Sequence, residues 1–501
     1  MSADLHALAH SLTKSEKKQL RIQGTRLDGT IANYLQLLDA LLAQPTFDEQ
    51  ALQAAFADSP MLGNFAVAKA YLYAAIVHAT THLQEPKSPE ATLRRAIDEV
   101  DFLLSKGLDR LAHKALEKAL HTARIIDLPA YKAELLRWKR RLTNKNPVKN
   151  QAEVLRQIEE EELLAIEQQL LDAKLRALRA KAQTLFAENV YARTAETQVK
   201  LLAIQTDPIL QADPAQFSFQ ARQTRQAILF ICHRMLGKES SSQKCLLDAL
   251  TEWNGRADLI RTFPDQYLQV LVSFLDASLG ARDFVTYLKF AATLSQFEPA
   301  AAKLHARAVL LRINLDLRYS LLTGDFEHGL QAGLLAQDAM EKHAQAADPS
   351  IAATMLFNLG SLYFLHGDYK HALQAINQIL NRQASPIRQD IADAARLMEM
   401  AIHLDLHHLD LVESLQRAMH RRLRLHPRSE DFENILVRGL KKWWEALPVQ
   451  QEAILRETYH EIRELEGVAG LIGRQEILLW LRSKIEGIAP ALIIRKEGAG
   501  A

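Results

Sequence analysis

Three histidines form the arrangement in this chain that comes nearest to a metal-binding pattern. His403 and His407 are four residues apart, so they would share one face of a helix, and His408 follows directly. Two imidazoles at this spacing can bind zinc, but structural and catalytic zinc sites use three or four protein ligands. The two cysteines, Cys232 and Cys245, make no ligand pattern. We therefore expect packed or solvated histidines, with no metal and no other cofactor.

The sequence motifs of the common enzyme classes are missing. The chain has no Gly-x-x-x-x-Gly-Lys-Ser/Thr phosphate loop, no Gly-x-Ser-x-Gly turn and no Gly-x-Gly-x-x-Gly dinucleotide motif. The carboxylates from Glu159 to Glu162 form one run, which is typical of a solvated helix face and not of a converging catalytic pair. We therefore expect a protein without catalytic activity.

Two clusters of basic residues could contact phosphate groups. The first is Arg137, Lys139, Arg140, Arg141, Lys145 and Lys149, and the second is Arg417, Arg421, Arg422, Arg424 and Arg428. The acidic run from Glu153 to Glu162 could neutralise the first cluster, whereas no acidic residue interrupts the second. An alternative function is therefore a nucleic-acid-associated regulator that uses the second cluster or the N-terminal helical module. The net charge of +1 argues against it, so a protein partner is favoured over nucleic acid.

The elements that would position binding residues are helices, and the clearest pattern lies in the stretch 354–380. Its first half has apolar residues at helical spacing, and Gly367–Asp368 ends that pattern as a turn. A second helix follows, with Ala372 as a small residue. Gly360 costs about 1 kcal/mol inside a helix, which makes sense if the second helix passes close to it at Ala372.

This stretch resembles the tetratricopeptide repeat. The matching residues are Leu356, Leu359, Gly360, Tyr363, Gly367, Tyr369 and Ala372. The resemblance implies an all-α, TPR-like solenoid of stacked antiparallel helix pairs whose first helices line a concave face. The whole chain is also similar to an uncharacterised bacterial family of helical-repeat proteins through residues 12–18, 47–49 and 69–72, a similarity that implies no known activity.

A short pattern of aspartate followed by an aromatic residue or leucine recurs in the second half of the chain. It occurs at Asp283-Phe284, Asp325-Phe326, Asp368-Tyr369 and Asp410-Leu411, with gaps of 42, 43 and 42 residues. Self-similarity at such a period is typical of repeat arrays. We therefore expect a TPR-like array of helix pairs over residues 208–425.

The resemblance also implies a binding groove, if the inner-face positions of the repeat apply at this period. The groove would be lined by Gln269, Asp276, Asn314, Arg318, Phe357, Ser361, Phe364, Arg396, Glu399 and His403. Such a lining suits the carbonyls, carboxylates and apolar side chains of a peptide. The implied function is a scaffold that binds a peptide or partner protein. The competing interpretation is that some of these residues are buried between neighbouring helices.

The remaining segments predict three further regions. Residues 1–85 predict an N-terminal helical module in which Thr13 and Glu16 form a capping box. Residues 86–207 predict helix pairs that include one long helix over 151–187, where neither Gly nor Pro occurs. Residues 426–501 predict a C-terminal helical cap, with helices near 429–446, 449–466 and 474–486, and a disordered tail from Lys496.

The long helix carries a heptad pattern. Leu164, Leu171, Leu178 and Leu185 recur every seven residues, as in a coiled-coil seam. Because the pattern lasts barely three heptads, a long helix packed within the array is the favoured interpretation. Dimerisation through the seam stays open.

The composition bounds the class and the location of the protein. A chain that is 48% hydrophobic, with few runs of β-branched residues, favours helices throughout. Two cysteines without a pattern fit a reducing compartment. There is no signal segment and no apolar run of about 18 residues, so we expect a cytoplasmic protein without a membrane partner.

Overall fold

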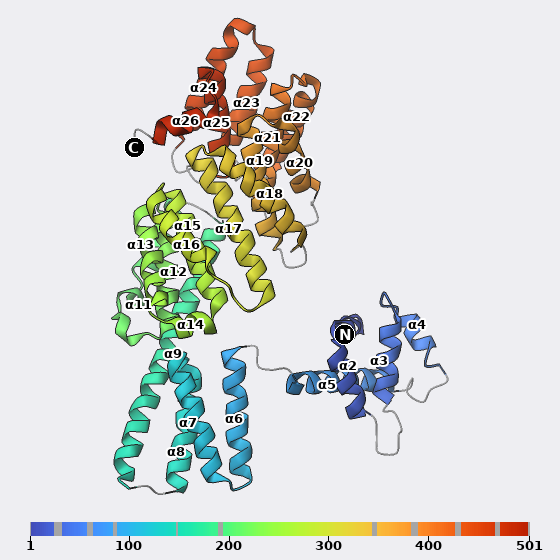
Figure 1. The fold of residues 1–501 in the computed structure, drawn as a ribbon, viewed down its shortest axis with the longest axis vertical. Helices are drawn as coiled ribbons and strands as arrows, with labels where there is room; N and C mark the ends of the chain where they lie inside the picture. Colours follow the sequence, from blue (N-terminus) through green and yellow to red (C-terminus); the bar gives the residue numbers. More distant parts are fainter. Residues whose placement is uncertain are drawn as a thin grey trace. The chain divides into compact units, whose positions relative to one another are not determined.

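The computed structural model describes residues 2–24, 33–57, 64–83, 88–146, 149–188, 194–342, 348–381, 389–425, 432–465 and 471–498. Every regular element in these ranges is a helix and none is a strand, which confirms the expected all-α class (Figure 1). The chain forms two compact units, Met1–Ala115 and Leu116–Ala501. Helix α7 (Asp109–Ile125) crosses the division between them.

The first unit contains the helices of the predicted N-terminal module, residues 1–85, and also α6 (Pro89–Ser105), which the sequence had assigned to the next region. They are α1 (Ser2–Ser11), α2 (Lys14–Gly24), α3 (Asn33–Ala43), α4 (Glu49–Ala54), α5 (Phe65–Leu83) and α6. Leu20, Leu38 and Leu72 belong to the core that α2, α3 and α5 share. The expected capping box is present, because the Thr13 N–H donates to Glu16 Oε2 over 2.7 Å and the Glu16 N–H donates to Thr13 Oγ1 over 3.3 Å.

The second unit continues with helices to the end of the described chain. They are α8 (Pro129–Lys145), α9 (Gln151–Glu188), α10 (Ala195–Gln205), α11 (Pro208–Gln211), α12 (Phe219–Met235), α13 (Glu239–Asn254), α14 (Ala257–Thr262), α15 (Pro264–Gly280), α16 (Phe284–Ser295), α17 (Ala302–Thr323), α18 (Phe326–Lys342), α19 (Pro349–His366), α20 (Tyr369–Asn381), α21 (Gln389–Asp405), α22 (Leu409–Leu425), α23 (Phe432–Glu445), α24 (Pro448–Glu464), α25 (Arg474–Glu486) and α26 (Pro490–Gly498).

Consecutive helices of the second unit pack as pairs. The pairs are α12 with α13, α15 with α16, α17 with α18, α19 with α20, and α21 with α22. The first helices of successive pairs also contact one another, α15 with α17, α17 with α19 and α19 with α21. These first helices therefore form one layer, and the helices from α17 to α26 contribute to a common hydrophobic core.

A recurrent turn joins the two helices of a pair. A residue with positive φ ends the first helix at Gly237, Arg282, Gly324, Gly367 and His407, at intervals of 40–45 residues. In three of these turns the next residue is an aspartate that accepts a backbone N–H of the second helix: Asp283, Asp325 and Asp368. The fourth expected turn, at Asp410, is wrong by two residues. Asp410 lies inside α22, and His408 occupies the equivalent position because α21 already ends at Asp405.

The helix predicted over residues 151–187 is confirmed as α9. It packs on α8, α10 and α12, and Leu175, Leu178 and Leu185 are buried in the core that this packing forms. The C-terminal part of the predicted heptad seam is thus occupied within the chain. Leu164, at the other end of that seam, is 47% exposed.

Several glycines mark where helices of the second unit approach closely, among them Gly360 and Gly439. A Cβ added to Gly360 in α19 would lie 3.5 Å from Ala375 Cβ and 3.9 Å from the Ala372 carbonyl oxygen, both in α20. Gly360 therefore faces the second helix of its pair, as expected. A tighter approach, which the sequence pattern did not predict, occurs at Gly439 in α23. A Cβ there would lie 2.2 Å from Thr458 Oγ1 of α24.

The end of the chain differs from the expectation. The closing helices are present as α23, α24 and α25, but residues 490–498 form the additional helix α26. Lys496 and Glu497 are therefore helical, and their assignment to a disordered tail was wrong; residues 499–501 lie outside the described ranges. Helix α26 is held because Ile493 and Ile494 are buried in the core.

Candidate partner-binding surface

The ten residues predicted to line a groove lie on four first helices of the second unit. Gln269 and Asp276 lie on α15, and Asn314 and Arg318 on α17. Phe357, Ser361 and Phe364 lie on α19, and Arg396, Glu399 and His403 on α21. The structure places these groups in three different environments.

The three residues on α19 are inside the protein. Phe357, Ser361 and Phe364 are 4%, 0% and 3% exposed. Helices α25 and α26 pack on α19, and the ring centroids of Phe364 and Trp480 in α25 are 6.4 Å apart. A partner could reach these residues only after the helices that pack on α19 had moved away.

Helix α25 is held in this position by a buried carboxylate at the end of α21. Asp405 Oδ2 accepts the Tyr369 hydroxyl over 2.5 Å and the Trp480 indole N–H over 3.0 Å. Lys484 Nζ lies 2.8 Å from Asp405 Oδ1. The donors come from α20 and α25, so one carboxylate joins three helices. Burial, the hydrogen bond to Asp405 and the charge of that carboxylate raise the pKa of Tyr369, so the hydroxyl remains a donor well above neutral pH.

A polar surface runs along α15 and α17. We call it the α15–α17 face and define it by Asp265, Gln269, Asp276, Arg307, Asn314 and Arg318. Arg307 donates to Asp265 Oδ1 over 2.5 Å and to Gln269 Oε1 over 3.0 Å, and Arg318 pairs with Asp276. The side chains of Arg318 and Asp276 are 30% and 43% exposed. Unlike α19, this part of the layer offers polar groups that solvent reaches.

Arg318 stands where this face meets the C-terminal helices. Burial and the nearby Arg234 lower the pKa of Arg318 to about 10, while Glu476 in α25 and Glu239 in α13 act in the opposite direction. Burial also raises the pKa of Glu476. The guanidinium is still charged at neutral pH. It therefore attracts carboxylates in a setting poorer in water than an open surface.

Of the three residues on α21, Arg396 and Glu399 lie in a half-buried polar group, whereas His403 contacts His408. Arg396 donates to Asp393 over 3.1 Å, and Arg422 of α22 donates to the same carboxylate oxygen over 2.5 Å. Burial raises the pKa of Glu399, and burial together with Arg422 lowers the pKa of Arg396. The charges of this group are thus largely satisfied by one another.

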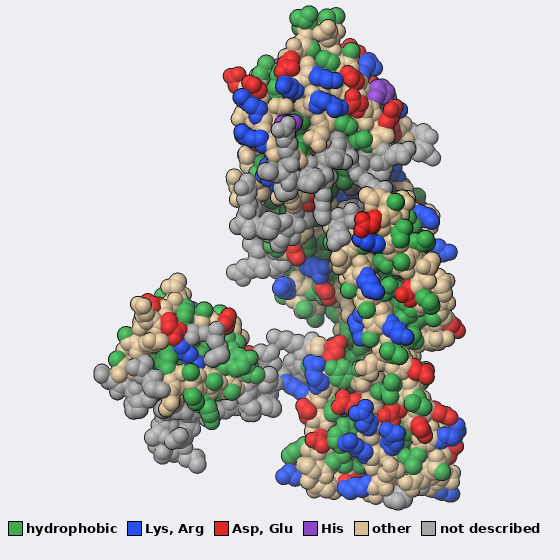
Figure 2. Space-filling model, turned by 180° about the vertical axis from the view of Figure 1, so that it is seen from behind, with side chains coloured by type: hydrophobic (Ala, Val, Ile, Leu, Met, Phe, Trp, Pro, Cys, Tyr) green, Lys and Arg blue, Asp and Glu red, His purple; other side chains and the backbone are tan. Residues whose placement is uncertain are grey.

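Both basic clusters found in the sequence are partly neutralised. In the first, Arg137 and Arg140 contact Glu162 of α9, Lys139 pairs with Glu117, and Arg141 lies over the Trp138 ring. In the second, Arg422 pairs with Asp393 and Arg417 with Glu413. The Arg424 side chain and Arg428 lie outside the described residues. Figure 2 shows basic and acidic side chains interspersed over the face seen there.

A further basic group lies on α2 in the first unit. Lys14, Lys17, Lys18 and Arg21 are spaced so that they share one face of this helix, and they line one pocket together with Ile22. Arg21 is 2.6 Å from Asp39 of α3. This group was not singled out in the sequence, although its spacing of three and four residues is the signal that could have identified it.

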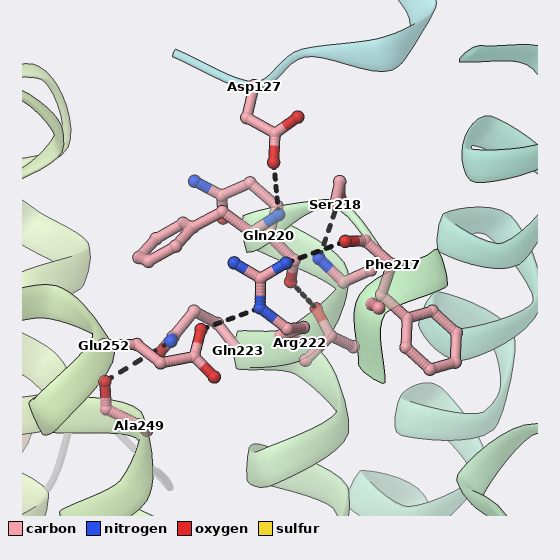
Figure 3. A network of polar contacts seen from close by, with 12 residues as sticks. Asp127, Phe217, Ser218, Gln220, Arg222, Gln223, Ala249 and Glu252 are labelled. Carbon is pink, nitrogen blue, oxygen red and sulfur yellow. Dashed lines mark hydrogen bonds and ion pairs between the residues drawn. The ribbon is translucent and has the colours of Figure 1, made fainter. Parts of the chain in front are cut away.

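Sequence reasoning also missed a polar junction at the start of α12 (Figure 3). Asp127 Oδ2 accepts the Phe219 N–H over 2.6 Å, and the Ser218 hydroxyl donates to the buried Asp172 of α9 over 2.9 Å. Arg222 donates to Glu252 of α13 over 2.9 Å and to the Phe217 carbonyl over 2.8 Å. The two carboxylates, Asp127 and Asp172, lie at the N-terminus of α12, where the helix dipole favours negative charge. Together these hydrogen bonds join α9, α12, α13 and the α7–α8 turn.

The histidines do not form the face that their spacing suggested. His407 has a φ of 59° and lies beyond the end of α21, so it does not continue the helical face of His403. His403 Nδ1 is instead 3.1 Å from His408 Nδ1. Across the described ranges, no three or more His, Cys, Asp or Glu side chains are grouped so that they could hold a metal ion.

Comparison of the chain with protein-family models, with curated proteins and with solved structures found no match. A search of the described helices also found none with the length and apolar character needed to cross a membrane.

Proposed function

We propose that this protein is a non-enzymatic scaffold that binds a peptide or a segment of a partner protein on the α15–α17 face. In this proposal the helix pairs form a TPR-like solenoid, and the layer of first helices is its binding side. Gln269 and Asn314 recognise backbone amides of the partner, while Arg318 and Asp276 exchange their mutual ion pair for charges on the partner.

The proposal rests on one observation: other helices of the chain bury part of the layer of first helices, whereas another part exposes its polar side chains to solvent. At α19 the layer holds a helix, α25, which belongs to the same chain. At α15 and α17 the layer has half-exposed ion pairs, Arg307 with Asp265 and Arg318 with Asp276. A layer that binds a helix at one end and exposes polar groups at the other is suited to a second, external segment.

Peptide selection tests this proposal without knowledge of the natural partner. Peptides would be selected from a random library on the parent protein, and their affinities measured by fluorescence anisotropy. The double variant Gln269→Ala/Arg318→Ala should bind them at least about tenfold more weakly. Lys289→Ala, an exposed residue of α16, is the control and should bind like the parent. Equal affinities for all three proteins would place the binding site elsewhere.

A second candidate, binding of nucleic acid, is favoured by one observation, the basic face of α2. Lys14, Lys17, Lys18 and Arg21 line one pocket there. A salt titration with generic DNA and RNA is the appropriate test, since phosphate contacts weaken steeply as the salt concentration rises. Affinity that falls with salt and is lost in Lys14→Gln/Lys17→Gln/Lys18→Gln supports this function. Absence of binding at low salt removes it.

A further inference from the structure

Helix α9 exposes a second apolar seam, distinct from the leucines that it buries. The exposed residues are Leu163, Ile166, Leu170, Ala173, Ala177 and Ala180, and we call them the α9 stripe. Leu163, Ile166 and Leu170 are 55%, 44% and 56% exposed. The spacing alternates between three and four residues, which is the spacing of a coiled-coil seam. At about 1.5 Å per residue the stripe extends over roughly 27 Å of the helix.

A row of charges beside the stripe changes sign along the helix. Glu160, Glu167, Lys174 and Lys181 recur every seven residues and are exposed. Glu160 also pairs with Arg156 of its own helix. No ion pair joins Glu167, Lys174 or Lys181 to another side chain in the part of the chain that the structure describes. The N-terminal half of this row is therefore acidic, and the C-terminal half is basic.

We propose that two copies of the chain associate through the α9 stripe, with their α9 helices antiparallel. In this register Leu163, Ile166 and Leu170 of one copy lie opposite Ala180, Ala177 and Ala173 of the other. Every layer then joins one large and one small residue, which lets the helices approach closely. The same register brings Glu160 near Lys181 and Glu167 near Lys174 of the second copy.

A parallel arrangement fits the same residues poorly. It would place leucine against leucine at one end and alanine against alanine at the other, leaving a gap between the helices. The sequence of the stripe thus favours a copy of itself running in the opposite direction. The contact is shorter than in permanent dimers, so the dimer should be reversible and concentration-dependent.

Charge reversal tests the pairing, with the mass of the full chain measured by sedimentation. The parent should shift from a 56.5 kDa monomer toward twice that mass as its concentration rises. The all-acidic variant Lys174→Glu/Lys181→Glu and the all-basic variant Glu160→Lys/Glu167→Lys should each stay monomeric, and an equimolar mixture should dimerise. A parent that is monomeric up to about 0.2 mM would overturn the proposal, as would variants that dimerise like the parent.

Neighbouring leucines provide a matched control for the stripe. Leu163→Glu should abolish the dimer, whereas Leu164→Glu, a similarly exposed leucine that points away from the stripe, should leave it intact. Equal behaviour of the two variants would show that the stripe is not the interface.

Disulfide formation reports the orientation of the two helices. The chain's own Cys232 and Cys245 are buried, so they provide a low background. Leu163→Cys/Ala180→Cys should form disulfide-linked dimers on oxidation, whereas Leu163→Cys alone should not. A dimer linked through the single variant would contradict the antiparallel arrangement.

Discussion

Helix α19 and the pair α15 and α17 belong to one layer of first helices, yet they differ in what covers them. On α19, Phe357 and Phe364 are buried under α25, which Asp405 holds through Trp480 and Lys484. On α15 and α17, the ion pairs remain half-exposed. The layer therefore serves as a core where the chain's own C-terminal helices cover it, and as a partly exposed polar surface along α15 and the adjoining part of α17.

The largest effect on this comparison should come from Trp480→Ala. It removes a buried ring packed near Phe364 together with the indole donor to Asp405, so we expect a loss of about 3–5 kcal/mol in the free energy of unfolding. Urea denaturation followed by circular dichroism measures it. Trp480→Phe is the control that keeps an aromatic ring and loses only the hydrogen bond. A parent-like midpoint for Trp480→Ala would mean that α25 is not seated on α19.

Asp405→Asn should have the next largest effect. The amide cannot replace a charged acceptor for Tyr369, Trp480 and Lys484, and we expect a loss of about 2–3 kcal/mol. The exposed Asp410→Asn should change the unfolding free energy little. Similar midpoints for the two variants would show that the buried carboxylate contributes no more than a surface one.

Substitutions of Gly360 sharpen the description of α19 as a packed helix. Gly360→Leu should cost about 1–3 kcal/mol through overpacking against Ala375. Gly360→Ala should be neutral or stabilise by up to about 1 kcal/mol, because a Cβ fits there and alanine favours a helix. Thermal melts of both variants separate these effects. If leucine is tolerated as well as alanine, α20 does not pass close to this position.

Arg318→Gln should act on binding more than on stability. Its ion pair with Asp276 is partly solvated, so we expect a change of less than about 1 kcal/mol in the free energy of unfolding. The affinity for peptides selected on the parent should fall clearly in the same variant. Severe destabilisation without a loss of peptide affinity would show that Arg318 supports the fold and does not bind the partner.

The smallest expected effect concerns pH and Glu476. Because burial raises its pKa, the folded chain keeps a proton on this carboxyl where the unfolded chain, with an ordinary pKa of 4.5, has lost it. The free energy of unfolding therefore falls as pH rises above that value. Glu476→Gln should consequently be more stable than the parent at neutral pH, and the difference should vanish near about pH 4. Chemical denaturation at both pH values measures it; a constant difference would argue against the raised pKa.

The elements were predictable where local signals decide them. Thr13 and Glu16 identified the start of α2, the Gly- and Pro-free stretch identified α9, and Gly367–Asp368 identified the turn after α19. The cover over α19 was not predictable, because it depends on Trp480 reaching Asp405, 75 residues earlier in the chain. Periodicity shows which side of a helix is apolar, but it does not show which distant segment lies against that side.

Thiol labelling measures the difference between the two regions of the layer directly. Ser361→Cys would place a thiol on α19 and Gln269→Cys one on α15, against a parent whose own cysteines are buried. The thiol at 269 should react as freely as one in an unfolded chain. The thiol at 361 should react at least about 100-fold more slowly, because it must wait for the helices packed on α19 to open. Equal labelling rates in the native protein would contradict the account, since the layer would then be equally open at both helices.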